Sequence, residues 1–377
     1  MGALRSATLP PTTDSRFSMR TFNFSAGPAT LPLSVLEDVR AEMLDYRGTG
    51  MSIIEMSHRS APYEAVHRGA IGLVRELAAV PDEFEILLLQ GGATLQFSMV
   101  PMNLLASGGR AAYVDTGAWA SKAIADAAIH GDVYVPWTGR DGGYRRAPEP
   151  DAIAVAEGTR YLHITSNETI GGVQYRSWPK VDAPLVADMS SDFLSRPVPW
   201  ERFDLAYAGV QKNLGPAGLA VVVVRGSLLG EARPAVGAYL RYEAHGEKAS
   251  LYNTPPVFSI YVMEKVLRWM ADEGGVPAME SAAIRRSQMV YDEIDASDGF
   301  YRSPVDAESR SRTNVVFRIA DPGREPGFIV RAAERGLVGL GGHRSVGGIR
   351  ASLYNAMPVE GVEALVAFMN DFRARRS

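Results

Sequence analysis

The sequence predicts an α/β protein with a large domain, built on a mainly parallel β-sheet flanked by helices, and a smaller α+β domain at the C-terminus. Two observations support this fold class. Short apolar runs of strand length alternate with stretches whose apolar residues recur at helical spacing, which is typical of a parallel sheet covered on both faces. After Glu273-Gly274-Gly275 the pattern changes to longer helices with few strands. A chain of 377 residues is long enough for two hydrophobic cores.

The predicted segments follow from these patterns. Residues 1–20 are polar, contain prolines and lack the apolar centre of a secretory signal, so we expect a disordered tail. A transit peptide or a start at Met19 are alternatives for this tail. Residues 21–275 are expected to form the large domain, whose N-terminal segment could pack on the small domain. Residues 276–377 are expected to form that small domain.

The expected elements alternate along the chain. A helix should begin at Ser34, an N-cap candidate with Glu37 three residues later as in a capping box. The other expected helices cover 61–79, the stretch after Gly91-Gly92, 119–130, 259–270, 277–295, 327–335 and 359–373. The expected strands cover 85–89, 111–114, 133–135, 161–165, 185–187, 205–208, 220–224, 315–319 and 348–352.

Composition excludes several classes of function. The net charge is −4, and no basic run is interleaved with aromatic residues, so a nucleic-acid partner is not expected. No apolar run approaches the roughly 18 residues of a membrane span. The chain has no cysteine, which excludes disulfides, thiolate metal sites and a cysteine nucleophile. These features fit a cytoplasmic protein, and we expect no metal site.

One lysine stands out from the rest of the chain. The stretch FDLAYAGVQKNLGPAGLAVVVVR, at 203–225, places Lys212 between an apolar run and a strong strand signal, and Lys212 is one of five lysines beside thirty-four arginines. Arginine cannot lose its proton, whereas burial lowers the pKa of a lysine and makes it a nucleophile or a general base. A strand-end lysine that extends to water is the alternative interpretation.

Other polar or aromatic residues lie at predicted strand ends, where open α/β sheets bind ligands. Gly91-Gly92-Ala93-Thr94 opens a helix and could offer backbone N–H groups to a phosphate, although a glycine pair is more often only a turn. Trp119 could stack on an aromatic ring or pack in the core. Thr169 could hydrogen-bond a ring hydroxyl or hold a turn.

Asp188 completes a set of groups that suits one cofactor. It ends the strand before the one that leads to Lys212, and a buried carboxylate there needs a cationic partner. Pyridoxal 5'-phosphate requires a carboxylate at its pyridine nitrogen and a lysine at its aldehyde. Together with the phosphate loop, the indole of Trp119 and the nearby amide of Gln211, these residues predict a pyridoxal phosphate site.

Several longer motifs resemble a known family. The sequence resembles the phosphoserine aminotransferases, which are class V, fold-type I pyridoxal phosphate enzymes, from about Thr21 to the C-terminus. The matching stretches are FNFSAGPATLP, IEMSHRS, GGATLQF, SNETIGG, AYAGVQKNLGPAGL, YNTPPVF and GHRSVGGIRASLYNAMP. Many matches in the same order are far more specific than one glycine motif. Some relatives have an arginine where this chain has Thr94, which affects one auxiliary phosphate contact.

The resemblance implies a role for each matching residue. Lys212 would be the Schiff-base lysine, Asp188 would lie at the pyridine nitrogen, and Trp119 would stack on the ring. The residues implied at the cofactor phosphate are Ala93, Thr94 and Gln211, with Thr169 at the ring hydroxyl and with Asn253 and Thr254 reaching the phosphate of the neighbouring subunit. The resemblance therefore implies a homodimer with active sites at the subunit interface.

The substrate site is expected to contain arginines and histidines, because the planar guanidinium suits both carboxylates and phosphates. The resemblance implies that Arg350 binds the substrate carboxylate. His58 and Arg59, from the partner subunit, and His343 and Arg344 would face the phosphate or the glutamate side chain. Each could instead be a solvated surface residue, but their place in glycine-rich loops favours a binding role.

The predicted reaction is a reversible transfer of an amino group between glutamate and 3-phosphohydroxypyruvate, giving phosphoserine and 2-oxoglutarate in serine biosynthesis. A second step, on phosphohydroxythreonine in pyridoxal phosphate (pyridoxine) biosynthesis, stays open. The nearest alternative is another class V aminotransferase acting on serine, alanine or glyoxylate. A cysteine desulfurase would need a cysteine, a nicotinamide dehydrogenase would need GxGxxG after the first strand, and a non-catalytic binding protein would not need the lysine.

Overall fold

The computed structural model describes residues 20–105, 108–232 and 235–375. The predicted N-terminal tail therefore lies outside the described residues, apart from Arg20. Within the described part of the chain, no helix is long and apolar enough to cross a membrane.

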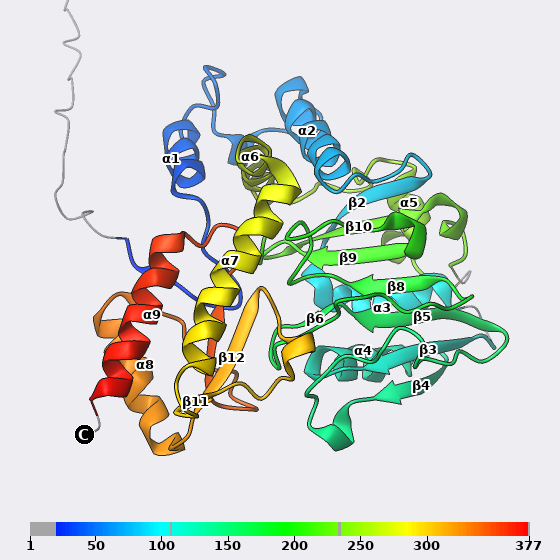
Figure 1. Cartoon of the computed structure of the whole chain (residues 1–377). Helices are drawn as coiled ribbons and strands as arrows, with labels where there is room; N and C mark the ends of the chain where they lie inside the picture. The colour runs from blue at the N-terminus through cyan, green and yellow to red at the C-terminus, as the bar shows by residue number, and fades with distance from the viewer. Residues whose placement is uncertain (1–19, 106–107, 233–234, 376–377) are drawn as a thin grey trace, which may run out of the picture.

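Seven of the described strands form one large sheet, which lies on the right in Figure 1. The strands of this sheet are β2 (Phe84–Gln90), β3 (Arg110–Asp115), β4 (Asp132–Thr138), β5 (Thr159–Thr165), β8 (Leu185–Asp188), β9 (Leu205–Gly209) and β10 (Leu219–Arg225). Their order is β2-β10-β9-β8-β5-β3-β4. Only β10 pairs antiparallel with its two neighbours in this set, so the predicted mainly parallel sheet is confirmed.

The two faces of the sheet are both covered, and the alternation of side chains along a strand explains why. On β2, Ile86 and Leu88 join the core under α2 (Ala61–Leu77) and α6 (Val257–Asp272). Leu87 and Leu89 point to the other face, where α3 (Gly92–Leu104), α4 (Ala118–Ala127) and α5 (Tyr242–Gly246) lie. A strand that is buried on both faces needs an uninterrupted apolar run, and this is why the sequence shows one.

A second hydrophobic core lies beside the large sheet (Figure 1). Its elements are α7 (Gly275–Asp295), β11 (Tyr301–Arg302), β12 (Asn314–Ile319), α8 (Glu325–Glu334), β13 (Leu337–Val338), β14 (Ile349–Ser352) and α9 (Val359–Ala374). The first strand of the chain, β1 (Phe22–Asn23), pairs with β13, and Phe24 is part of this second core. Helix α7 contributes to both cores, and the predicted boundary near residue 275 remains a proposal.

Most predicted elements agree with the structure to within a few residues, but one predicted cap is wrong. Helix α1 (Leu33–Glu42) begins before Ser34, its N-cap is Pro32, and no side chain caps it. A capping box occurs instead at Ser52 and Glu55, where a short 3-10 helix begins. The sequence analysis did not identify α5, the hairpin of β6 (Asn167–Glu168) and β7 (Val173–Gln174), or the short strands β1, β11 and β13.

Buried amides join the two cores next to the predicted site. Asn167 donates to the side-chain oxygen of Asn314 at 2.8 Å. The backbone N–H of Asn355 donates to Asn213, the neighbour of Lys212, at 3.1 Å. These contacts connect elements more than 140 residues apart in the chain. The second contact fixes the segment that follows β14 against the loop that carries Lys212.

Candidate active site

Lys212 lies in the turn between β9 and β10 and is 9% exposed. Its Nζ donates a hydrogen bond to the Thr169 hydroxyl at 2.6 Å. Burial lowers the pKa of Lys212 to about 8, and the negative charges of Asp188 and Glu168 oppose this shift. The amine is therefore held inside the protein with an appreciable neutral fraction near neutral pH, as a nucleophile or general base requires.

Asp188 is the last residue of β8 and is 5% exposed. One carboxylate oxygen accepts the N–H of Ser190 at 2.9 Å. Burial raises the pKa of the Asp188 carboxyl, and the charge of Lys212 opposes this rise. The cation expected beside this carboxylate is thus Lys212.

Trp119 is the second residue of α4 and lies beside the lysine. The centroid of its ring is 5.8 Å from Nζ of Lys212. Its Nε1 is buried and has no hydrogen-bond partner in the structure, and the ring is only half buried. The indole therefore has both an accessible surface and an unused donor.

The start of α3 is a second unsatisfied group of donors. Gly91 and Gly92 have φ of 92° and 65°, the left-handed region that glycine tolerates, and a Cβ at Gly91 would lie 2.6 Å from a methyl of Leu95. No side chain caps this helix, so its first-turn N–H groups, which include the positions of Ala93 and Thr94, lack an internal partner. Such a helix start suits an anion.

Gln211 precedes the lysine and bends over Gly209, where a Cβ would lie 2.8 Å from the Gln211 side-chain oxygen. This oxygen, Oε1, is buried without a partner. The Gln211 backbone carbonyl accepts the N–H of Ala29 at 2.9 Å. A Cβ on the nearby Gly27 would lie 3.3 Å from Cγ of Gln211. The FNFSAGPATLP motif can therefore pack closely on the lysine loop because Gly27 has no side chain.

Arg350 reaches the same site from β14 and donates to the backbone carbonyl of Thr169 at 3.3 Å. Burial lowers its pKa, and its Nε has no partner in the structure. Desolvation lowers the pKa of His343, and nearby positive charges lower it further. These charges belong to Arg350, Lys122 and Arg344. Arg350 thus lies close enough to Lys212 for its charge to act on the amine, and His343 lies near Arg350.

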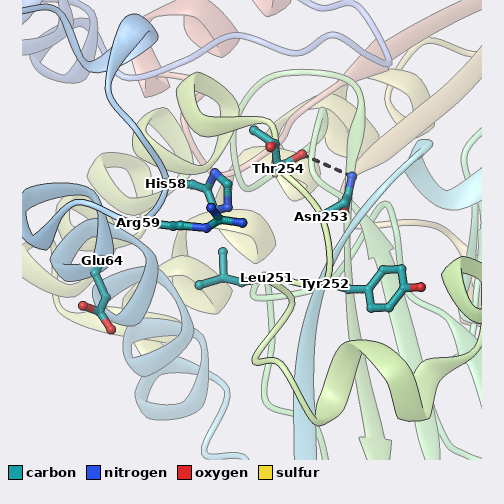
Figure 2. Close-up of a pocket in the computed structure, with 7 residues that line it drawn as sticks. All are labelled: His58, Arg59, Glu64, Leu251, Tyr252, Asn253 and Thr254. Atoms are coloured by element: carbon teal, nitrogen blue, oxygen red, sulfur yellow. Dashed lines mark hydrogen bonds between the residues drawn. The ribbon is translucent and has the colours of Figure 1, made fainter.

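The remaining predicted residues lie in a different pocket. A cavity of 590 Å³ is lined by His58, Arg59, Glu64, Leu251, Tyr252, Asn253 and Thr254. Figure 2 shows His58 and Arg59 on one side of this cavity with Thr254 and Asn253 facing them. Lys212 is not among the described residues that line it. The backbone carbonyl of Thr254 accepts a hydrogen bond at 3.1 Å from Gln90, which directly precedes Gly91.

The sequence analysis missed Glu168, which is completely buried beside Thr169. Its carboxylate accepts the backbone N–H of Trp119 at 3.0 Å and of Ala120 at 2.9 Å. Burial raises the pKa of Glu168 to about 7. The signal available in the sequence was an acidic residue in a stretch that otherwise reads as a buried strand end, where a carboxylate needs a partner.

The unsatisfied groups define what the site can hold. Within the described residues, Trp119 Nε1, Gln211 Oε1 and Arg350 Nε are buried without partners and no side chain caps the start of α3. The Asp188 carboxylate and the Lys212 amine lie close enough for their charges to interact. These groups suit a ligand with an anionic group, a basic aromatic ring and a carbonyl, and pyridoxal phosphate combines all three. Among the described residues, no set of three His, Cys, Asp or Glu side chains could hold a metal ion.

Comparison with known proteins gives consistent matches. The model of the class-V aminotransferases matches residues 21–365. A phosphoserine aminotransferase of Niallia circulans is 48% identical over 360 residues, which cover 95% of this chain and 99% of that protein. The solved phosphoserine aminotransferase of Bacillus circulans subsp. alkalophilus superposes with a TM-score of 0.93 at 48% identity, over 95% of this chain and 99% of that chain. A phosphoserine aminotransferase of Trichomonas vaginalis, solved with bound PLP, has a TM-score of 0.88 at 36% identity, over 93% and 100%.

Proposed function

Because this chain belongs to the class-V aminotransferases, which have the fold-type I architecture, we propose that it is a phosphoserine aminotransferase of serine biosynthesis. It would transfer the amino group of glutamate reversibly to 3-phosphohydroxypyruvate. One observation carries this proposal: the buried amine of Lys212, between Thr169 and Trp119, lies in a chain that is 48% identical to such enzymes over 95% of its length. Nothing in these features favours serine, alanine or glyoxylate as substrate.

The cofactor of this reaction would be pyridoxal phosphate. When bound, it supplies an aldehyde that condenses with amines and a protonated ring that withdraws electrons from the neighbouring carbon. The Asp188 carboxylate would keep the proton on the ring nitrogen, and the hydroxyl of Thr169 would bind the ring hydroxyl. The uncapped start of α3, with Ala93 and Thr94, and the NH₂ group of Gln211 would bind the phosphate.

The amine of Lys212 would hold the cofactor and then move the proton. As the base of the site, Nζ would take the proton from the Cα of the substrate. A base whose pKa is about 8 can accept and return a proton near neutral pH, which suits a reversible reaction. Burial, which lowers this pKa, also keeps water away from the reacting carbon.

The substrate would be recognised by the basic side chains. Arg350 is half buried and has an unused Nε, so it suits the carboxylate that all the amino-acid substrates share. His343 and Arg344 would face the phosphate or the side chain of glutamate. The specificity of the enzyme would arise because Arg350 binds the carboxylate and the other basic residues bind the phosphate. Serine has no phosphate for them to bind.

The pocket in Figure 2 supports a homodimer with shared active sites. His58, Arg59, Asn253 and Thr254 are polar groups suited to phosphate binding, yet they line a cavity that does not contain Lys212. A second copy of the chain would bring its own lysine to this cavity. Tyr252 is 44% exposed on its wall, and Ile54, four residues before His58, is 56% exposed, so apolar surface is available for such a contact.

An absorbance titration tests the function. The purified protein, loaded with pyridoxal phosphate, is mixed with phosphoserine or, separately, with serine. We expect phosphoserine to remove the visible band of the loaded protein at concentrations where serine leaves it unchanged. Equal bleaching by serine would move the assignment to the alternative class V aminotransferases. The absence of any visible band after loading would refute the role of Lys212.

A further inference from the structure

Helix α4 carries Trp119 but cannot cap itself. Its N-cap residue is Gly117, which has no side chain, so the N–H groups at the second and third helical positions need a partner from elsewhere. Glu168, on β6 and about fifty residues further along the chain, supplies it. One of its carboxylate oxygens accepts from Trp119 and the other from Ala120, at 3.0 and 2.9 Å.

The contact between the helix start and the carboxylate is closely fitted. Glu168 is 0% exposed, and a Cβ placed on Gly117 would lie 2.7 Å from Cδ of Glu168. Since real side chains do not tolerate that separation, Gly117 is required for the carboxylate to reach the helix. The residue next to Glu168 in the chain is Thr169, whose hydroxyl accepts the hydrogen bond from Lys212. A single dipeptide thus contacts both Trp119 and Lys212.

We propose that Glu168 is a positioning residue, which sets the place of the Trp119 indole in the cofactor site by holding the start of α4. The inference rests on the proposed function, because it needs pyridoxal phosphate as the ligand. Glu168 touches neither substrate nor cofactor in this account. It acts through the backbone of Trp119, whose stacking distance depends on where the first turn of α4 lies.

The chemistry of the carboxylate explains why an amide cannot replace it. An ionised carboxylate accepts hydrogen bonds on both oxygens, whereas a glutamine has one oxygen and an NH₂ group that would oppose the second N–H donor. Burial raises the pKa of Glu168 to about 7, while the two N–H donors and the charge of Lys212 favour the ionised form. Glu168→Gln keeps the size of the side chain and removes one of its two contacts.

The test measures the dissociation constant of pyridoxal phosphate from the cofactor-free protein and the visible circular dichroism of the saturated protein. Glu168→Gln is expected to raise the dissociation constant about 2- to 30-fold, the effect of losing a helix cap from the binding-competent state. It should also change the circular dichroism of the bound cofactor. The matched control is Glu264→Gln, a buried carboxylate on α6 that accepts a hydrogen bond from Arg268. This control should alter neither quantity.

A double-mutant cycle with Trp119→Ala separates positioning from general stability. If Glu168 acts through the indole, Glu168→Gln should have less than a 2-fold effect on the dissociation constant when Trp119 is already alanine. Equal effects in both backgrounds, or an unchanged dissociation constant in Glu168→Gln, would overturn the proposal. Should Glu168→Gln fold poorly, Glu168→Asp, which keeps the charge on a shorter side chain, is expected to bind less tightly than wild type, and unchanged binding would overturn the proposal. A wild-type protein that binds no pyridoxal phosphate would instead refute the proposed function.

Discussion

The pKa of Lys212 can be measured directly, because the chain contains only five lysines. Burial lowers this pKa from 10.5 to about 8. The difference between these two pKa values corresponds to about 3 kcal/mol of differential stabilisation of the neutral amine. At pH 7 the neutral fraction would rise from about 0.03% to about 9%, roughly 300-fold, so far more of the amine is in the form that attacks an aldehyde.

The assay is an NMR titration of cofactor-free protein labelled with ¹³C at the lysine Cε. The signal that disappears in Lys212→Arg belongs to Lys212. Its midpoint should lie near pH 8, well below the ordinary lysine value of about 10.4. Asp188→Asn removes the negative charge that most strongly opposes the shift, so the midpoint should move below 8 in this variant.

The direction in which the Lys212 midpoint moves in Asp188→Asn tests whether burial sets the pKa. If burial sets the pKa, loss of the neighbouring carboxylate disfavours the ammonium further, and the midpoint falls. A midpoint at or above 10 in the wild-type protein would refute the argument that the amine is desolvated. A midpoint that rises in Asp188→Asn would show that the carboxylate does not act on Lys212 through its charge.

Three further predictions concern turnover. Lys212→Ala should abolish transamination while the thermal unfolding midpoint changes little, and full activity in this variant, measured with glutamate and 3-phosphohydroxypyruvate, would contradict the assignment. Arg350→Ala should raise KM for both amino acids by about 10- to 150-fold, the usual effect of losing a charged hydrogen bond. Steady-state kinetics in which only one of the two substrates is affected would argue against a shared carboxylate site. Mixed dimers of Lys212→Ala with Arg59→Ala should recover roughly a quarter of wild-type activity, because half of randomly mixed dimers are hybrids with one intact site. No recovery over the two separate variants, in protein shown by native mass spectrometry to contain hybrids, would mean that the sites are not shared.

Much of the large sheet and of its helices was predictable from the sequence because their signals are local. The apolar runs at 86–89 in β2 and 219–224 in β10 are uninterrupted, since these stretches are buried on both faces, and this pattern does not depend on which strands are neighbours. Lys212 was also identifiable locally, as a rare amine within an apolar stretch. Its partner Thr169, 43 residues away, was a candidate only because strand ends meet at one edge of a parallel sheet.

The tertiary structure decided what depends on contacts between distant segments. Ser34 is a residue type that favours the N-cap position, but the N-cap of α1 is Pro32. The tertiary structure overrides this local preference. The pairing of β1 with β13 joins residues more than 300 positions apart, and two-residue strands carry no pattern of their own. Glu168 shows locally only that a buried carboxylate needs a partner. The sequence does not show which partner, because the N–H groups that it caps belong to a helix about fifty residues earlier.

The sequence by itself therefore determined the mainly parallel sheet, the succession of most helices and strands along the chain, and the chemical groups available to the site. Periodicity and residue type are properties of short segments, so they do not depend on contacts with the rest of the chain. Only the tertiary structure decided how those groups meet: that Glu168 holds the start of the helix that carries Trp119, and that Arg350 reaches Thr169 from the second core. It also separated His58 and Arg59 from Lys212 within one chain, because distances between segments depend on packing, which no short pattern encodes.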